Sequence, residues 1–419
     1  MGEQNWAGNV DYGAARLLRP TSVEQLQDMV RHAGRVRVVG SRHSFNELVS
    51  TPDTLISLAE LPFDIEVGAD GRTATVPGAA TYGAVTAALH AHGLALPALA
   101  SLPHISVAGA CATGTHGSGD GVKGLASAVT AVEFVQADGA LETLRRNDPE
   151  FAAAVVNLGA IGAVVRVTFD VVPAFDIRQD VYDDVQIGPY GDELLDALGQ
   201  AYSVSLFSDF GSDRFTMAWL KRKVPSDGFA APSPTWRGGP LADGARHPVP
   251  GQPPLGTTRQ STVGPWHERL PHFRLDVPPS SAGNELQSEF LVPRGQAPAA
   301  WRALLQVREV IAPLLQISEV RSIAGEEQWL SPAYARDSVG FHFTWVPDVV
   351  GVDLALTVLE PLLAQFDARP HWGKVFVTPV REVAHRYPRI ADFAAVVHRR
   401  DPEGRFRNRF VEQVIGSHA

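Results

Sequence analysis

The pattern of polar and apolar residues changes at Pro173, and this change constrains the fold more than any other feature of the sequence. Before Pro173, segments of helical spacing such as 23–30 and 82–92 alternate with short β-branched runs such as 36–39, which is typical of α/β layers. Four later segments alternate polar and apolar residues: 203–219, 285–292, 316–323 and 340–346. They predict an antiparallel sheet with one polar face, so we expect an α+β fold of two or three packed units.

Two other stretches stand out by their small residues. Residues 101–121 form the most Gly-rich polar stretch of the chain, and their small side chains predict a segment outside the hydrophobic core. Residues 224–265 are rich in Pro and Gly with weak periodicity. We expect an extended loop there, without chemistry of its own.

The composition disfavours several classes of protein. The chain has 419 residues, a formal net charge of −10 and one cysteine, Cys111. An acidic chain without a long Lys/Arg tract predicts no nucleic-acid partner. One cysteine cannot form an internal disulfide, and residues 1–10 have neither a basic segment nor an apolar core of signal-peptide length, so we expect a cytoplasmic protein. No run reaches the ~18 apolar residues of a membrane span, so no membrane partner is expected.

Several familiar motifs fail on inspection. The stretch 117–124 resembles a phosphate loop but lacks its Gly-Lys-Ser/Thr end. His267 and His272 are one residue too far apart for a zinc-binding helix and have Pro271 between them, so we predict a loop there and no metal site. No GxGxxG follows the first strand, which disfavours an ordinary Rossmann dehydrogenase.

Two segments carry the chemistry that remains. Residues 39–46, Val-Gly-Ser-Arg-His-Ser-Phe-Asn, form a strand end and a turn whose N–H groups are suited to a pyrophosphate. His43 is the unusual member, although on this turn alone a surface or hydrogen-bonded His is the more common outcome. Residues 100–117 are rich enough in Gly and Ala to let a large planar cofactor and its phosphates approach the backbone.

With these segments and the Leu-Gly-Ala-Ile-Gly turn at 158–162, the first 175 residues resemble the FAD domain of the vanillyl-alcohol oxidase flavoprotein superfamily. The whole chain is similar to bacterial alditol (xylitol/sorbitol) oxidases, including the Asp-Pro-x-Gly-x-Phe-x-Asn-x-Phe pattern at 401–410. The resemblance implies FAD joined covalently to His43 through the 8α-methyl of its isoalloxazine ring. The family turn reads Gly-Ser-Gly-His-Ser, and Arg42 replaces its middle Gly, so this position must tolerate a side chain.

The resemblance also implies which residues surround the cofactor. Family members whose flavin is attached covalently at two points carry a Cys near Ser101. This chain has no Cys there, so a single covalent attachment, through His43, is expected. Cys111 is expected to pack near the cofactor as a small residue. The residues that the resemblance assigns to FAD are Val39, Gly40, Ser41, Arg42, His43, Ser44, Ser101, Ser106, Gly109, Ala110, Cys111, Ala112, Val164 and His371.

Alternation places polar residues on shared faces of two strand-like segments after Pro173. Glu319 and Arg321 are two residues apart, as are His342 and Thr344, and the aromatic residues beside His342 point to the opposite side. From alternation alone, a solvated face is the more common outcome. The resemblance instead implies a polyol pocket on this sheet, formed by Ser101, Gln287, Glu319, Arg321, His342, Thr344 and Lys374.

The resemblance implies a reaction as well. A primary alcohol is oxidised when a hydride passes from C1 to flavin N5 and the hydroxyl proton leaves, and negative charge then gathers on the N1/C2 edge of the ring. We expect Arg321 and Lys374 to stabilise this charge, and His342, oriented by Glu319, to accept the proton. Loss of the hydride and the proton would convert the alcohol to the aldose, and O2 would then reoxidise the flavin with release of H2O2. The expected polyol ligands are Ser101, Gln287 and Thr344.

These expectations divide the chain into three parts. We predict an FAD-binding domain of two α/β subdomains over 1–175, a cap domain on an antiparallel sheet over 176–378, and a C-terminal segment over 379–419 that returns to the FAD domain. The expected partners are a small-molecule polyol and O2, and a monomer is expected. Two alternatives stay open: an aldonolactone oxidoreductase of the same superfamily, and a flavin-free sugar-binding protein.

Overall fold

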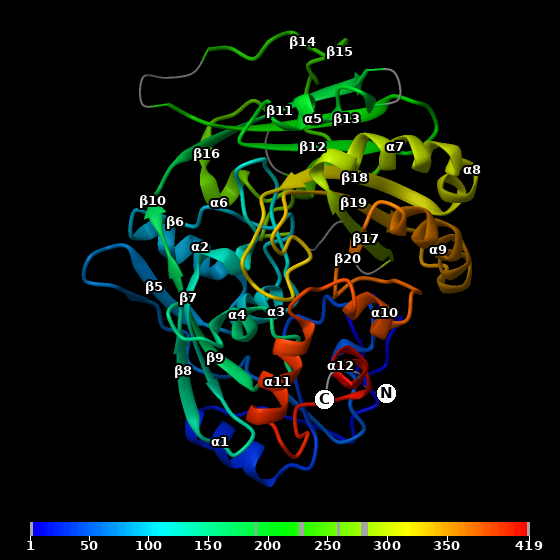
Figure 1. The fold of residues 1–419 in the computed structure, drawn as a ribbon. Helices are drawn as coiled ribbons and strands as arrows, with labels where there is room; N and C mark the ends of the chain where they lie inside the picture. The colour runs from blue at the N-terminus through cyan, green and yellow to red at the C-terminus, as the bar shows by residue number, and fades with distance from the viewer. Residues whose placement is uncertain (1–2, 189–190, 226–229, 258–259, 278–283, 417–419) are drawn as a thin grey trace.

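A computed structural model describes residues 3–188, 191–225, 230–257, 260–277 and 284–416. Three larger sheets organise these residues: a three-stranded parallel sheet, a five-stranded antiparallel sheet and an eight-stranded antiparallel sheet. The eight-stranded sheet lies above the other two in Figure 1. This arrangement of helices and mainly antiparallel sheets confirms the predicted α+β class.

The parallel sheet has the order β1 (Arg16–Leu18), β3 (Thr54–Ser57) and β2 (Val36–Val39). Helix α1 (Val23–His32) has Ser22 as its N-cap, and the Oγ of Ser22 accepts a hydrogen bond from the N–H of Gln25. The apolar face of this helix buries Leu26 and Val30. Strand β2 leads directly into the turn that contains His43.

The five-stranded sheet packs with three helices around one buried core. Its strands, in spatial order, are β4 (Glu66–Val67), β5 (Thr73–Pro77), β9 (Ala163–Asp170), β7 (Val129–Val135) and β8 (Leu141–Arg145). The helices are α2 (Tyr82–Ala91), α3 (Val107–Ala112) and α4 (Phe151–Val155). Val107 and Cys111 are buried in this core, which corrects the expectation that 101–121 lies outside it. Small side chains let α3 pack closely against the neighbouring elements.

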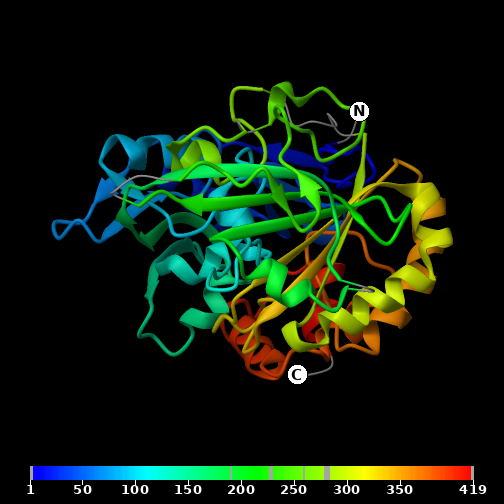
Figure 2. The same ribbon diagram turned by 90° about the horizontal axis from the view of Figure 1, so that it is seen from above.

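The eight-stranded sheet carries the polar face expected from the sequence. Its strands, in spatial order, are β16 (Gly264–Pro265), β11 (Asp176–Val185), β13 (Phe215–Lys223), β12 (Ser203–Ser208), β18 (Leu315–Ile323), β19 (Ser338–Trp345), β17 (Leu286–Pro293) and β20 (Arg369–Pro370). Five helices accompany this sheet: α5 (Leu194–Leu198), α6 (Trp266–Arg269), α7 (Ala297–Gln306), α8 (Arg308–Ile311) and α9 (Val349–Ala364). Figure 2 shows α7, α8 and α9 gathered on one side of it. Phe341, Phe343 and Trp345 pack in the core with α7 and α9, so His342 and Thr344 face the other way.

The structure corrects two predictions in this region. Residues 203–219, predicted as one segment, form two strands, because the turn at 209–213 contains Gly211, whose N–H bonds Asp209 Oδ1 at 2.8 Å. The stretch 224–265 is not entirely a loop. It contains the pair β14 (Thr235–Trp236) and β15 (Gly239–Pro240), together with edge strand β16, although 226–229 and 258–259 lie outside the described residues.

The C-terminal helices pack into the core of the five-stranded sheet. These helices are α10 (Val380–Ala384), α11 (Ile390–Arg400) and α12 (Arg409–Ile415), and they lie in the lower half of the molecule in Figure 1. Buried Arg37 on β2 connects them to the N-terminal part, because its guanidinium donates to the carbonyl oxygens of Phe406, Leu48, Leu158 and Gly159 at 2.7–2.9 Å.

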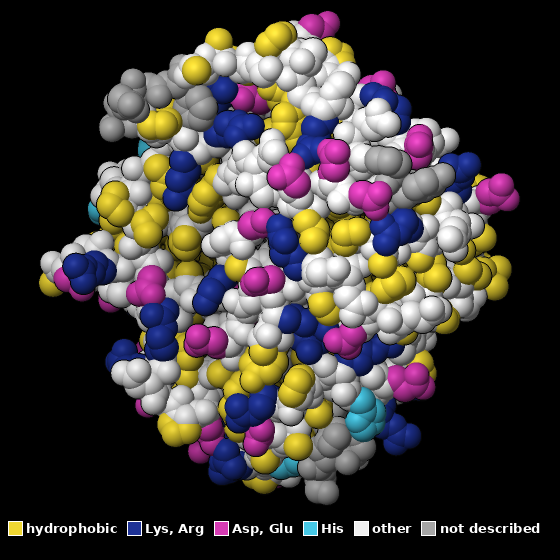
Figure 3. Space-filling view, turned by 45° about the horizontal axis from the view of Figure 1, so that its top comes forward, with side chains coloured by type: hydrophobic (Ala, Val, Ile, Leu, Met, Phe, Trp, Pro, Cys, Tyr) yellow, Lys and Arg dark blue, Asp and Glu magenta, His cyan; other side chains and the backbone are white. Residues whose placement is uncertain are grey.

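The surface shown in Figure 3 mixes basic and acidic side chains, and exposed pairs such as Arg302 with Asp192, 2.9 Å apart, are frequent in the described chain. No helix among the described residues is long and apolar enough to cross a membrane. The same part of the chain contains no group of three or more His, Cys, Asp or Glu residues arranged for a metal ion.

Candidate active site

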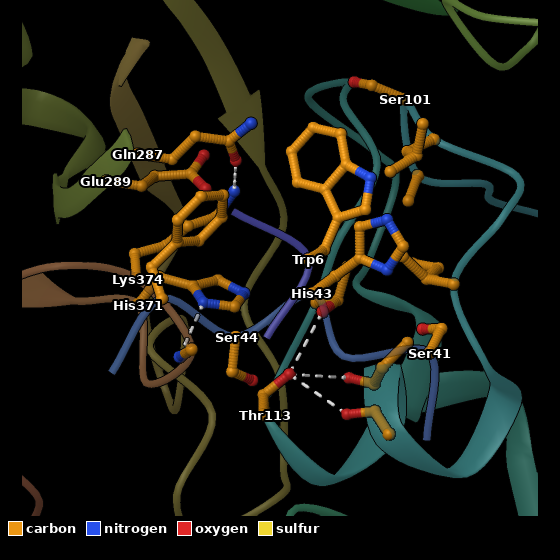
Figure 4. A pocket seen from close by; sticks show the side chains of 18 of the residues that line it. Trp6, Ser41, His43, Ser44, Ser101, Thr113, Gln287, Glu289, His371 and Lys374 are labelled. Atoms are coloured by element: carbon orange, nitrogen blue, oxygen red, sulfur yellow. Dashed lines mark hydrogen bonds between the residues drawn. The ribbon is translucent and has the colours of Figure 1, made fainter. Parts of the chain in front are cut away.

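A cavity of about 250 Å³ lies between the parallel sheet with helix α3 and the eight-stranded sheet. One side is formed by the turn after β2 and by α3, and the other by β17, β18, β19 and the segment 371–374 (Figure 4). Every predicted polyol-pocket residue lines this cavity: Ser101, Gln287, Glu319, Arg321, His342, Thr344 and Lys374. The polar faces of these strands therefore enclose a cavity and are not solvated surfaces.

The turn after β2 presents His43 to the cavity. Neither buried ring nitrogen of His43 makes a hydrogen bond of ordinary geometry within the described chain. Burial lowers the pKa of His43 to about 4, so the imidazole is neutral at neutral pH and keeps a lone pair. Ser41 Oγ accepts the N–H of Ser106 at 3.0 Å, which joins this turn to α3. A Cβ on Gly40 would overlap Ser106 Oγ, so this close approach requires glycine.

Arg42 adopts the left-handed conformation, with φ +65°, at the position where the family turn has Gly. The N-terminal segment holds it there. Its carbonyl accepts the N–H of Trp6 at 2.8 Å, and its guanidinium lies 2.5 Å from the carboxylate of Glu3. A non-glycine residue in this conformation costs ~1–2 kcal/mol, which these contacts offset. The indole of Trp6 stacks on the ring of His43.

Helix α3 supplies a wall of small residues. Gly109, Ala110, Ala112 and Thr113 line the cavity. Cys111 and Val164, both predicted near the cofactor, are not among the described residues that line it. The thiol of Cys111 instead lies 3.5 Å from Tyr82 Oη, and burial raises the pKa of this thiol to about 12. The remaining predicted cofactor residues all line the cavity: Val39, Gly40, Ser41, Arg42, His43, Ser44, Ser101, Ser106 and His371.

Arg321 is the central cation of the opposite wall. Its guanidinium donates to Glu289 Oε1 at 2.9 Å and to Ser101 Oγ at 3.0 Å, and lies 3.6 Å from Glu319 Oε2. Both carboxylates raise the pKa of Arg321 despite its burial, so it stays charged. In turn, Arg321 holds the pKa of Glu289 and of Glu319 below the ordinary range, although burial opposes this.

The carboxylate that contacts His342 differs from the one predicted. His342 Nδ1 lies 3.5 Å from Glu289 Oε2, and its Nε2 lies 3.2 Å from Thr344 Oγ1. Glu319 is bonded instead to Nε2 of His272 at 2.9 Å. Burial lowers the pKa of His342, so its ring is neutral at neutral pH.

Three residues of this site were missed from the sequence. Glu289 follows Gln287 by two positions on the same face of β17, so the alternation rule applied to 285–292 was a usable signal. His116 Nε2 lies 3.3 Å from Glu289 Oε1 and comes from the Gly-rich stretch. His272 lies in the segment predicted as a plain loop; part of that segment is helix α6, and His272 itself lines the cavity.

Lys374 is the second cation of the site. Its Nζ donates to Gln287 Oε1 and lies 5.6 Å from the centre of the Phe45 ring. Burial lowers the pKa of Lys374 to about 8. Asn46 holds the segment in place, since its Nδ2 donates to the carbonyls of Trp372 at 2.8 Å and of Lys374 at 2.9 Å. The segment 371–374 therefore lies against the His43 turn.

Comparisons with known proteins agree with these features. Residues 14–145 match the FAD binding domain family, and residues 284–414 match the D-arabinono-1,4-lactone oxidase family. The chain is 45% identical to an alditol oxidase of Streptomyces sp. over 98% of both chains. It is 28% identical to an L-gulono-1,4-lactone dehydrogenase of Mycobacterium tuberculosis, again over 98% of both.

A solved structure shows the same fold. Cholesterol oxidase from B. sterolicum superposes with a TM-score of 0.77 at 16% identity, over 98% of this chain and 96% of that one. The neutral imidazole of His43, the closely packed small residues and the cavity beside them fit an FAD site. The chain therefore belongs to the alditol oxidase family, within the vanillyl-alcohol oxidase type of FAD-dependent oxidoreductases.

Proposed function

We propose that this protein is an FAD-dependent alditol oxidase that converts the C1 primary alcohol of polyols such as xylitol and sorbitol to the aldose. One observation carries the proposal: a single cavity joins the neutral imidazole of His43 to the buried cations Arg321 and Lys374. The 45% identity to an alditol oxidase over the whole chain supports it.

His43 is proposed as the covalent attachment point of FAD. A neutral imidazole at the cavity wall keeps a lone pair that is suited to this bond, and its depressed pKa keeps the ring in that form. When bound, FAD would supply a two-electron acceptor for the C1 hydride, and O2 would serve as the terminal oxidant that is reduced to H2O2.

Arg321 and Lys374 are proposed to stabilise the negative charge that develops during the reaction. Both cations line the cavity and approach it from different segments, β18 and 371–374. Preorganised cations in a site that excludes water lower the barrier without reorganising during the reaction. The carboxylates beside Arg321 keep its guanidinium fixed in one orientation.

His342 is proposed as the proton acceptor. With its Nδ1–H directed at Glu289, the lone pair on Nε2 is left to accept the hydroxyl proton, next to Thr344 Oγ1. The orienting group in this proposal is Glu289, in place of the predicted Glu319.

The other polar residues of the cavity are proposed to bind the polyol. Each buried hydroxyl that is left unpaired costs ~1–3 kcal/mol, so a polyol site needs donors and acceptors in number. The cavity offers both kinds from Ser101, Gln287, Glu319 and Thr344.

A visible spectrum of acid-precipitated protein, followed by turnover of xylitol, sorbitol and glycerol with peroxide detection, tests the proposal. We expect a yellow precipitate and peroxide formation with at least one of these polyols. A flavin-loaded protein that is inactive on all three would refute it. In His43→Ala we expect total loss of the covalent link; flavin fluorescence that still follows the denatured band on a gel would contradict the proposed attachment.

An aldonolactone oxidoreductase is the second candidate, because residues 284–414 match the D-arabinono-1,4-lactone oxidase family. Reduction of the bound flavin by aldonolactones but not by polyols, under anaerobic conditions, would favour it, and an artificial electron acceptor separates an oxidase from a dehydrogenase. The match to an FAD binding domain argues against the flavin-free sugar-binding alternative.

We propose that the enzyme works as a cytoplasmic monomer, with domains over 1–175, 176–378 and 379–419. The one cysteine of the chain leaves no internal disulfide to form, which fits a reducing compartment. Size-exclusion chromatography with light scattering measures the oligomeric state, and cell fractionation measures the location.

A further inference from the structure

A buried lysine begins a chain of hydrogen bonds that ends at Glu319. Lys221 lies on β13 and is 1% exposed. Its Nζ donates to the carbonyls of Leu270 and Pro271 and lies 3.0 Å from His272 Nδ1. These three acceptors match the three N–H donors of an ammonium group.

The next link is His272, which lies between Lys221 and Glu319. An ammonium has no lone pair, so His272 Nδ1 must act as the acceptor in this contact. The single proton of the neutral ring is then on Nε2, which lies 2.9 Å from Glu319 Oε1. The rings of Trp219 and Phe207 pack against the imidazole, with centroids 4.9 and 5.8 Å away, and hold its plane.

We propose that Lys221 and His272 are positioning residues of this active site: Lys221 fixes the tautomer of His272, and His272 fixes the orientation of Glu319 toward the alditol. The inference rests on the proposed function, which gives Glu319 its contact with substrate. The backbone supports this arrangement, because the N–H of His272 donates to the carbonyl of Ser101 at 2.9 Å, which keeps the chain of contacts beside the substrate cavity.

The arrangement is sensitive to pH. Burial lowers the pKa of Lys221 to about 7 and that of His272 to about 4. The charged groups that face Lys221 are Glu319, which favours its protonated form, and Arg321, which disfavours it. Once Lys221 releases a proton to solvent, its lone pair accepts Nδ1–H, and Nε2 turns its own lone pair toward the Glu319 carboxylate. Glu319 Oε1 then loses the imidazole donor and keeps only the neighbouring Arg321 guanidinium, 3.6 Å from its Oε2.

Nitrogen NMR of flavin-loaded protein labelled with 15N-histidine tests the tautomer directly, with His272→Gln used to assign the signal. In the unmodified protein we expect the Nε2–H form at pH 5–6 and the Nδ1–H form at pH 9. In Lys221→Met this transition should be absent. A His272 signal that is unchanged across this range in the unmodified protein would overturn the proposal, and that result needs no variant. Polyol turnover plays no part in this readout, so inactivity on polyols refutes the proposed function alone.

Kinetics give a second readout. Lys221→Met should raise the KM for xylitol about tenfold, the scale of one buried hydrogen bond lost, with a smaller effect on kcat. His272→Gln keeps an N–H donor near the position of Nε2, so adding Lys221→Met to it should change KM no further. If the two substitutions raised KM independently, so that their factors multiplied in the double variant, Lys221 would not act through His272. Lys223→Met, on the exposed end of the same strand, is the matched control and should leave KM unchanged. Flavin absorbance reports folding in each variant.

Discussion

The indole of Trp6 lies nearly parallel to the imidazole of His43, with ring centroids 5.2 Å apart and planes 22° apart. Trp6 belongs to a segment that is fixed to the His43 turn, since Asn5 and Asn9 donate to the carbonyls of Ser44 and Phe45 at 3.0 Å. The segment 5–9 therefore packs against the imidazole on the turn that lines the cavity.

Trp6→Ala should lower the fraction of covalently bound flavin several-fold, because the imidazole loses the ring that holds its plane. Trp6→Phe should retain most of the covalently bound flavin, since a phenyl ring can also stack on the imidazole. The measurement compares acid-precipitable flavin with total flavin. Trp236→Ala, on β14, serves as the control. Equal covalent fractions in Trp6→Ala and the unmodified protein would remove Trp6 from the attachment step.

The orientation of the polar strand residues and the position of the His43 turn could be predicted because their signals are local, whereas the pocket itself was implied only by the family resemblance. The alternation around His342 identified one polar and one aromatic face of β19, and the structure shows both. The turn that follows β2 was recognised from its small and hydroxyl residues. Both signals depend on the period of a strand or on a few consecutive residues, and neither depends on the order of strands in the sheet.

The partner of His342 could not be predicted, because it depends on contacts that no local signal in the sequence reports. Strand β19 lies between β18 and β17, so His342 is in register with Glu319 on one side and Glu289 on the other. Glu319 is bonded to His272, so Glu289 is the carboxylate that remains for His342. His272 itself comes from a loop whose sequence has no periodic signal. The choice therefore depends on tertiary contacts between segments distant in the sequence.

Glu289→Gln should separate the two carboxylates functionally. Loss of the Glu289 charge weakens the orientation of both His342 and Arg321, so the limiting rate of flavin reduction should fall ~10–100-fold, the scale of one lost buried charge-assisted contact, with little change in KM. Glu319→Gln should mainly raise KM. Stopped-flow reduction across a range of xylitol concentrations measures both values. The reverse pattern would restore Glu319 as the partner of His342.

Arg321→Ala should slow flavin reduction by ~10²–10³, the usual effect of removing one preorganised donor to developing charge. Arg321→Lys should slow flavin reduction less, because lysine keeps the positive charge. Lysine cannot keep both hydrogen bonds, to Glu289 and to Ser101, in the geometry of the guanidinium. In Arg302→Ala, at an exposed position on α7, the flavin should be reduced at the normal rate. Anaerobic stopped-flow absorbance is the assay, and an unchanged rate in Arg321→Ala would exclude it from the mechanism.

Arg37→Met should destabilise the protein by at least about 3 kcal/mol, because hydrogen bonds to a charged group contribute ~1.5–3 kcal/mol each and four are lost. One of them, to Phe406, joins β2 to the C-terminal segment. Urea unfolding measures the change, and limited proteolysis should cleave the C-terminal segment more readily. Arg19→Met, an exposed site, is the control. A midpoint within error of the unmodified protein would contradict this role of Arg37.

The limiting rate of flavin reduction at saturating xylitol should fall as pH rises through about 8. Lys374 is charged below this pH, and its pKa is depressed from the ordinary lysine range by burial, so the stabilising cation is lost on the alkaline side. Lys374→Arg should move the fall to higher pH, because a guanidinium stays protonated. In Lys374→Met the limiting rate of flavin reduction should be about 10²-fold lower at every pH. Saturating substrate separates this effect from the pH dependence of KM expected of Lys221. An alkaline fall that persists unshifted in Lys374→Met would assign it to another group.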